Sequence, residues 1–168
     1  MRTSELLADA FERIRGRAAD VVDGLGPERL NHRVDGRANS ITWLLWHAAR
    51  VQDDHVADAT GGEQVWTSRG WAERFALPLD RGDTGYGHSS HQVGLVTVED
   101  GALLTGYLDD VLDRTLAAVA RLTDADLDRI VDEGWDPPVT LGVRLVSVVD
   151  DDLEHLGQAA FVRGLLDA

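Results

Sequence analysis

The sequence predicts an all-α fold, an antiparallel four-helix bundle with one long crossover between its second and third helices. Three observations lead to this prediction. Four segments repeat apolar residues at helical spacing, strand-like alternation is nearly absent, and 168 residues suffice for one domain, 1–168, with a substantial core. No internal repeat or interdomain linker divides that span.

The first two helices are predicted from their apolar spacing and their ends. The first covers about 4–24 and stops at Gly24, because glycine favours the end of a helix. The second covers about 40–59 and begins after Asn39 or Ser40, either of which can cap a helix with its side chain. Both helices alternate apolar and polar faces, as expected of bundle members.

The last two helices are predicted in the same way. The third covers about 98–121 and opens at Thr97 with a pattern similar to a capping box. The fourth covers about 140–166 and follows Pro138. Its spacing predicts a buried stripe formed by Val146, Val149, Leu153, Leu156 and Ala160.

A long connector, about 63–96, separates the second helix from the third. Residues 70–76 are predicted to form a short helix within it, and residues 82–91 are rich in glycine. A connector of this length is uncommon in a compact domain unless it has a function. We therefore interpret 82–91 as a lid whose Tyr86 and His88 contact a substrate, with a plain surface loop as the alternative.

The composition excludes several classes of protein. A net charge of −14 opposes binding to nucleic acid or to an anionic membrane surface. No apolar run reaches the roughly 20 residues that span a bilayer, and no signal peptide is recognisable, so we expect a cytoplasmic protein. Cysteine and lysine are both absent, which excludes thiol nucleophiles and Schiff-base mechanisms within the chain.

Three side chains on two predicted helices have the spacing of a metal site. Asp151 and His155 lie four residues apart and therefore share one side of the fourth helix. His47 on the second helix would complete a set of two histidines and one carboxylate. Three protein ligands leave coordination positions open, as in catalytic metal sites.

Alternatives exist for each ligand. Asp152 lies closer to the predicted apolar stripe than Asp151 and could replace it as the carboxylate. On the second helix, periodicity alone favours His55 over His47 as the buried histidine. Asp54 falls on the same face as His47 and could accept a hydrogen bond from its imidazole, holding that ring in orientation.

Five stretches in this order resemble the DinB-like superfamily, also known as DinB/YfiT-type metalloenzymes, in a branch found in high-GC bacteria. The resemblance covers nearly the whole chain. The stretches are NSITWLLWH at 39–47, RVQDDH at 50–55, DTGYGHSS at 83–90, WDPPVTLGVR at 135–144 and DDLEHLGQ at 151–158.

The resemblance implies a four-helix bundle, often a homodimer, that binds a divalent metal. By this resemblance zinc is the first candidate for the metal, and nickel, manganese and iron are the alternatives. The family's ligands are a histidine on the second helix, matched by His47, and a histidine pair on the last helix. The second of that pair is matched by His155, whereas the first falls on Asp151, where related thiol-dependent enzymes carry a carboxylate.

Relatives of this kind use a small thiol such as mycothiol or bacillithiol. They also place an acid and an arginine shortly after the last histidine. Here Ala160 replaces the acid and Arg163 retains the arginine, so Arg163, with Arg144 as a second candidate, is expected to bind a thiol cofactor or a carboxylate.

Three functions remain open on this basis. The first is a divalent-metal-dependent enzyme acting on a small-molecule substrate, a thiol-dependent S-transferase or isomerase. The second is a non-catalytic, metal-stabilised dimeric bundle with a stress or regulatory role, and the third is a small-molecule binding module without metal. A homodimer is expected from the resemblance and from the first and third helices, whose apolar faces are wide for a lone bundle.

Overall fold

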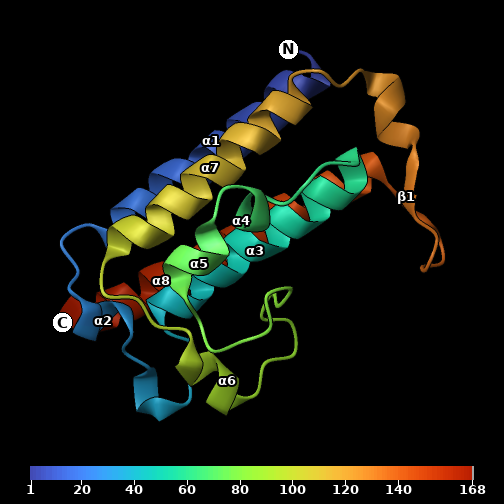
Figure 1. The fold of residues 1–168 in the computed structure, drawn as a ribbon. Helices are drawn as coiled ribbons and strands as arrows, with labels where there is room; N and C mark the ends of the chain where they lie inside the picture. The colour runs from blue at the N-terminus through green and yellow to red at the C-terminus, as the bar shows by residue number, and fades with distance from the viewer. Residues whose placement is uncertain (168) are drawn as a thin grey trace.

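Four long helices, α1 (Thr3–Val22), α3 (Ile41–Thr60), α7 (Gly101–Val119) and α8 (Leu141–Asp167), form a bundle in the computed structural model, which describes residues 1–167. Figure 1 shows α1 beside α7 and α3 beside α8, and contacts of α3 with α7 and of α1 with α8 close the bundle. Helices α1 and α8 run in one direction and α3 and α7 in the other. The predicted all-α four-helix bundle is confirmed.

Short elements connect these helices. Between α1 and α3 lie α2 (Pro27–Leu30) and the 3₁₀ turn η1 (Val34–Gly36). The long connector contains α4 (Val65–Ser68), α5 (Trp71–Phe75) and α6 (Ser90–Leu95), so the short helix predicted at 70–76 is confirmed. Before α8 come η2 (Asp124–Asp128) and two short antiparallel strands, β1 (Ile130–Asp132) and β2 (Val139–Thr140). Within 1–167, no helix combines the length and apolarity needed to cross a membrane.

The ends of α3 and α7 are set by side-chain caps. Ser40, rather than Asn39, caps α3 by accepting a hydrogen bond from the Trp43 amide at 3.1 Å. The predicted start of α7 at 98 is wrong. The Val98 amide and carbonyl are both bonded to the side chain of Asn31, so the helix begins only after Asp100, which caps it.

The buried face of α8 differs from the predicted stripe. Val146 and Leu153 are exposed, because α8 carries apolar residues on two faces and only one packs into the bundle. The correction places Asp151 and His155 at the edge of the buried face, where α3 runs alongside. The buried residues of α8 are Leu141, Leu145, Val148, Asp152, Leu156, Ala159 and Val162.

A buried carboxylate fixes the start of the connector to the bundle. Asp53 of α3 accepts hydrogen bonds from the amides of Val65 and Trp66, at 2.8 and 2.7 Å, and from the Tyr107 hydroxyl of α7 at 2.9 Å. Three donors on one carboxylate compensate for its removal from water. The connector is therefore held against α3 and α7 directly after the turn that ends α3.

Candidate metal centre

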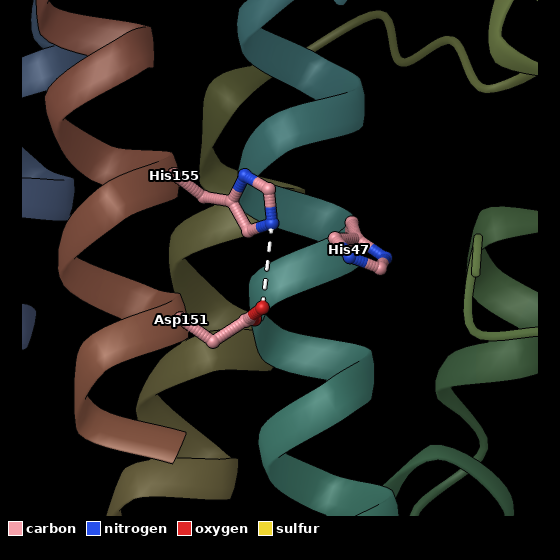
Figure 2. Close-up of side chains that lie close together, drawn as sticks. All are labelled: His47, Asp151 and His155. Carbon is pink, nitrogen blue, oxygen red and sulfur yellow. Dashed lines mark ion pairs between the residues drawn. The ribbon is translucent and has the colours of Figure 1, made fainter. Parts of the chain in front are cut away.

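His47 of α3 and Asp151 and His155 of α8 lie close together where these two helices run side by side (Figure 2). One ligand atom from each lies within 4.8 Å of the others. His155 Nε2 is 3.6 Å from Asp151 Oδ1, and the two imidazole centroids are 4.8 Å apart. Ligand atoms on one zinc-like ion lie at most roughly 4.4 Å apart, so a small side-chain rotation brings all three to one ion.

A main-chain carbonyl of the connector orients the buried imidazole of His47. Its Nδ1 lies 2.5 Å from the carbonyl oxygen of Thr84, which can only accept a hydrogen bond. Nδ1 therefore carries the proton, and the lone pair is on Nε2. The indole of Trp43 stacks on the same ring, with centroids 4.5 Å apart and an interplanar angle of 15°.

The surroundings keep the imidazole of His47 neutral. Burial lowers its pKa below the ordinary value, and the nearby His155 adds to this effect, while the Thr84 hydrogen bond only partly opposes it. A neutral imidazole is the form that binds a metal. The prediction that Asp54 orients this ring is wrong, because Thr84 occupies that role and Asp54 instead accepts a hydrogen bond from Gln64 at 2.7 Å.

Gly85 allows the connector to approach His47 this closely. Its φ is +92°, a conformation that L side chains rarely adopt. A Cβ at this position would lie 2.8 Å from His47 Nδ1 and 3.0 Å from a ring carbon of Trp46. Glycine is therefore required both by the backbone and by the contact.

A chain of hydrogen bonds fixes the rest of the glycine-rich segment. The Trp43 indole donates to His88 Nδ1 at 3.1 Å, so Nε2 of His88 carries the proton and donates to Asp83 at 2.9 Å. Asp83 also accepts from the Gly85 amide at 2.8 Å. The structure thus places 82–91 against the site, with the His88 side chain buried as an anchor, while Tyr86 is 92% exposed and lies outside these contacts.

Arg50 joins this segment to the buried network of the bundle. Its Nε donates to the Asp83 carbonyl at 3.1 Å, and its Nη1 donates to the Tyr107 hydroxyl at 3.2 Å. The guanidinium is fully buried, 3.6 Å from the carboxylate of Asp53 and 5.1 Å from the centre of the Trp66 ring. Both the carboxylate and the indole offset the removal of this charge from water.

Asp151 and His155 are coupled by charge. Burial favours the neutral carboxyl of Asp151, but the hydrogen bond and positive charge of His155 outweigh it and lower the pKa of Asp151. Burial likewise opposes protonation of His155, yet the bond and charge of Asp151, with a smaller contribution from Gln158, raise its pKa. Metal binding must therefore displace a proton from His155, so the affinity for metal falls as the pH falls.

The donor atoms fit a divalent ion. Each of the three residues offers one ligand atom within 4.8 Å of the other two, and among residues 1–167 Asp151 Oδ2 is buried without a hydrogen-bond partner, which is costly unless something binds it. Two imidazoles and one carboxylate suit zinc, nickel, manganese or iron(II). The residues present can thus hold such an ion and leave coordination positions free.

Asp152, the rival carboxylate, lies outside this trio. Its side chain is fully buried on the inner face of α8, and within the described part of the chain neither carboxylate oxygen has a hydrogen-bond partner. Burial, followed by the charge of Asp151, raises the pKa of Asp152 well above its ordinary value. Burial therefore favours the neutral form of Asp152, and the carboxylate that lies close to both histidines is that of Asp151.

Asp152→Asn should therefore reduce the pH dependence of stability. The pKa of Asp152 is higher in the folded state than in the unfolded state. Its contribution to the free energy of unfolding is therefore complete below about pH 4, the ordinary pKa of an aspartate, and is lost as the pH rises from there toward the pKa of the folded state. The loss is at most about 1.4 kcal/mol per pH unit. Urea unfolding of both proteins should be measured in the presence of a chelator from pH 4 to 8. As the pH rises, the free energy of unfolding of the variant should increase relative to that of the parent protein. Parallel curves would contradict the buried acid.

The remaining candidates have other partners. Arg144 donates to Asp132 at 2.7 Å, and Arg163 donates to the carbonyls of Asp20 and Val21 at the end of α1. These contacts engage both arginines in holding α8 to its neighbours. His55, the alternative to His47, is half-buried and lies 3.9 Å from Asp54, outside the trio.

The sequence did not single out the residues that orient His47. Thr84 acts through its carbonyl, which every residue has, so no residue pattern could identify it. Asp83 and Arg50 gave a usable signal: an acid and a histidine five residues apart in a glycine-rich stretch, and an arginine that directly follows the mostly apolar run 41–49 and precedes Asp53 by three residues. Such an arginine is rarely buried unless it is paired.

Known proteins share the sequence pattern and the fold. The model of the DinB superfamily matches residues 10–159. A crystal structure described as the conserved protein of a locus from Enterococcus faecalis is similar over 97% of this chain and 96% of its own, with a TM-score of 0.91 and 30% sequence identity. No curated protein matches this chain.

Proposed function

The chain belongs to the DinB superfamily, and from this premise we propose that it is a divalent-metal-dependent enzyme that joins a small thiol to an electrophilic substrate. Zinc is the first candidate for the metal, followed by nickel, manganese and iron. The thiol is mycothiol or a related compound, and the reaction is an S-transfer, with thiol-dependent isomerisation as the variant. The protein acts in the cytoplasm.

The observation that carries the proposal is that His47 of α3 and Asp151 and His155 of α8 bring one ligand atom each within 4.8 Å of the others. Three protein ligands leave room for a substrate atom, whereas structural sites are closed by a fourth ligand. A divalent ion, when bound, supplies Lewis acidity that lowers the pKa of a thiol or of water.

The chain's own residues prepare this site. His47 presents a neutral imidazole because Thr84 and burial fix its protonation. Trp43 covers one face of that ring and contacts His155 edge-on, which limits access of water from this side. Asp151 contributes the negative charge.

A thiol nucleophile has to come from outside the chain, since the chain has no cysteine. In the transfer, the sulfur of the external thiol forms a bond to the reacting carbon while the bond from that carbon to its leaving group breaks. The leaving group takes the bonding electrons, and the thiol proton passes to solvent.

Cobalt-substituted protein tests the proposal. Adding mycothiol, bacillithiol or glutathione should change the visible spectrum, because sulfur is a good ligand for borderline-soft ions. The change should disappear in His47→Ala and His155→Ala and persist in His55→Ala, a matched histidine on the same helix. Turnover of an electrophile with the thiol then distinguishes an enzyme from a metal-stabilised bundle. No spectral response to any thiol would reject the thiol and leave water as the nucleophile.

We also expect a homodimer, and the outer face of α8 supports it. The surplus apolar surface lies there, at Val143, Val146 and Leu153, rather than mainly on α1 and α7. Val146→Arg should therefore halve the mass in sedimentation at micromolar concentration. Leu6→Arg on α1 is the control, because Leu6 is 57% exposed and Val146 60%. A single-chain mass for the parent protein would reject the dimer.

A further inference from the structure

An apolar cavity of about 470 Å³ lies between the C-terminal half of α8, the start of α3 and the segment around η1. Its apolar walls are formed by Val34, Ala38, Leu44, Phe161, Val162 and Leu165. Phe161 is 68% exposed at its rim, an unusual position for a large aromatic ring unless something covers it.

The cavity lies next to the metal trio along the same two helices. Leu44 precedes His47 by three residues on α3, and Gln158 follows His155 by three on α8, so each pair shares one face of its helix. Because α3 and α8 are antiparallel, both steps lead in the same direction along the bundle (Figure 1). The cavity therefore begins about one helical turn, roughly 5.4 Å, from the ligands.

The walls select for uncharged, apolar groups. Among residues 1–167, those that line the cavity carry no charge, and Asn39 and Gln158 supply its polar side chains. This is unusual in a chain with a net charge of −14. A charged or strongly hydrated group would lose water here without gaining a partner, whereas a hydrocarbon group gains by leaving water.

We propose that this cavity binds the hydrocarbon part of the electrophilic substrate, an alkyl or aryl group, with the reacting carbon at the metal trio. The inference rests on the proposed thiol transfer and assigns its two substrates to different places. The apolar electrophile occupies the cavity, and the polar thiol approaches from the other side of the trio. Gln158, beside His155 and at the mouth of the cavity, contacts the polar atoms next to the reacting carbon.

A series of n-alkyl hydroxamic acids, from acetohydroxamic to octanohydroxamic acid, tests the cavity by calorimetric titration of the metal-loaded protein. The hydroxamate head binds a divalent ion and is the same throughout, so differences in affinity report on the tail. Once the chain extends past the first helical turn, affinity should rise about fourfold per added methylene group.

Two variants localise the effect. Phe161→Ser should flatten the increase with chain length, and Ala38→Phe, which fills the cavity, should remove the gain of the octyl compound. Both should leave acetohydroxamate binding unchanged. Leu6→Ser is the control, because Leu6 is exposed on α1, outside both the cavity and the apolar outer face of α8. Thermal melting verifies that each variant is folded.

Equal affinity across the series, or an increase that both variants leave intact, would overturn the proposal. The proposal would also be overturned if Phe161→Ser dissociated into single chains while affinity still increased with chain length. The cavity would then belong to a contact between two copies of the chain. If acetohydroxamate does not bind at all, the proposed metal-centred function fails. In that case n-alkanols, which bind without a metal, test the cavity. Their affinity should increase with chain length in the parent protein, and the same two variants should remove this increase.

Discussion

His155→Ala and His47→Ala should each reduce the metal content from about one divalent ion per chain to none. Each substitution leaves two protein ligands, which rarely retain an ion through purification. Elemental analysis of protein purified without chelator measures the effect. His47 contacts the connector through the Thr84 carbonyl and His155 contacts Asp151 of its own helix, and thermal melting of each variant verifies that the loss is one of ligand rather than of fold.

Two matched controls belong to this experiment. His55→Ala removes a half-buried histidine of α3 that lies outside the trio, and it should retain the ion. Asp151→Asn should weaken binding far more than Asp152→Asn, because only the Asp151 carboxylate faces both imidazoles. Unchanged metal content in both histidine variants would refute the site, and the reverse order of the two aspartates would transfer the carboxylate role to Asp152.

Gly85→Ala should have the second-largest effect, a loss of metal affinity of about 10- to 100-fold, which is typical when the contact that orients a ligand is disturbed. The new methyl group would lie within 2.8 Å of His47 Nδ1, so the connector must retreat and the Thr84 carbonyl must leave the imidazole. Overpacking of this kind destabilises a protein by about 1–3 kcal/mol.

Gly87→Ala is the control that separates contact from backbone strain. Gly87 also has a positive φ, +72°, but a Cβ there meets nothing within 4 Å. Both variants should lose some stability in urea unfolding, while only Gly85→Ala should lose metal affinity. Equal metal affinities in the two variants would show that the close approach to His47 is unimportant.

The sequence predicted what depends on local pattern. Apolar spacing identified the four helices, and a spacing of four residues brought Asp151 and His155 together, since both are properties of a helix itself. The start of α7 was misjudged because Asn31, 67 residues away, binds the amide and the carbonyl of Val98 and so keeps both out of the helix. No local pattern contains that contact.

The inner face of α8 shows a second limit. Two apolar stripes compete on this helix, and periodicity favoured the one that contains Val146 and Leu153, which the structure leaves exposed. The stripe that packs includes Asp152, a residue type that lowers the apparent hydrophobicity of the face it occupies. The choice is made by the neighbouring helices and not by α8 alone.

The contact between the Thr84 carbonyl and His47 has a consequence for how freely the site can change over many generations. The acceptor is part of the main chain, so exchanging the side chain at position 84 leaves it in place, whereas position 85 tolerates no side chain at all. Adjacent positions should therefore differ sharply in permissiveness: a library randomised at both should return many amino acids at 84 and glycine at 85. Substitutions at position 84 therefore leave in place the hydrogen bond that keeps the proton of His47 on Nδ1.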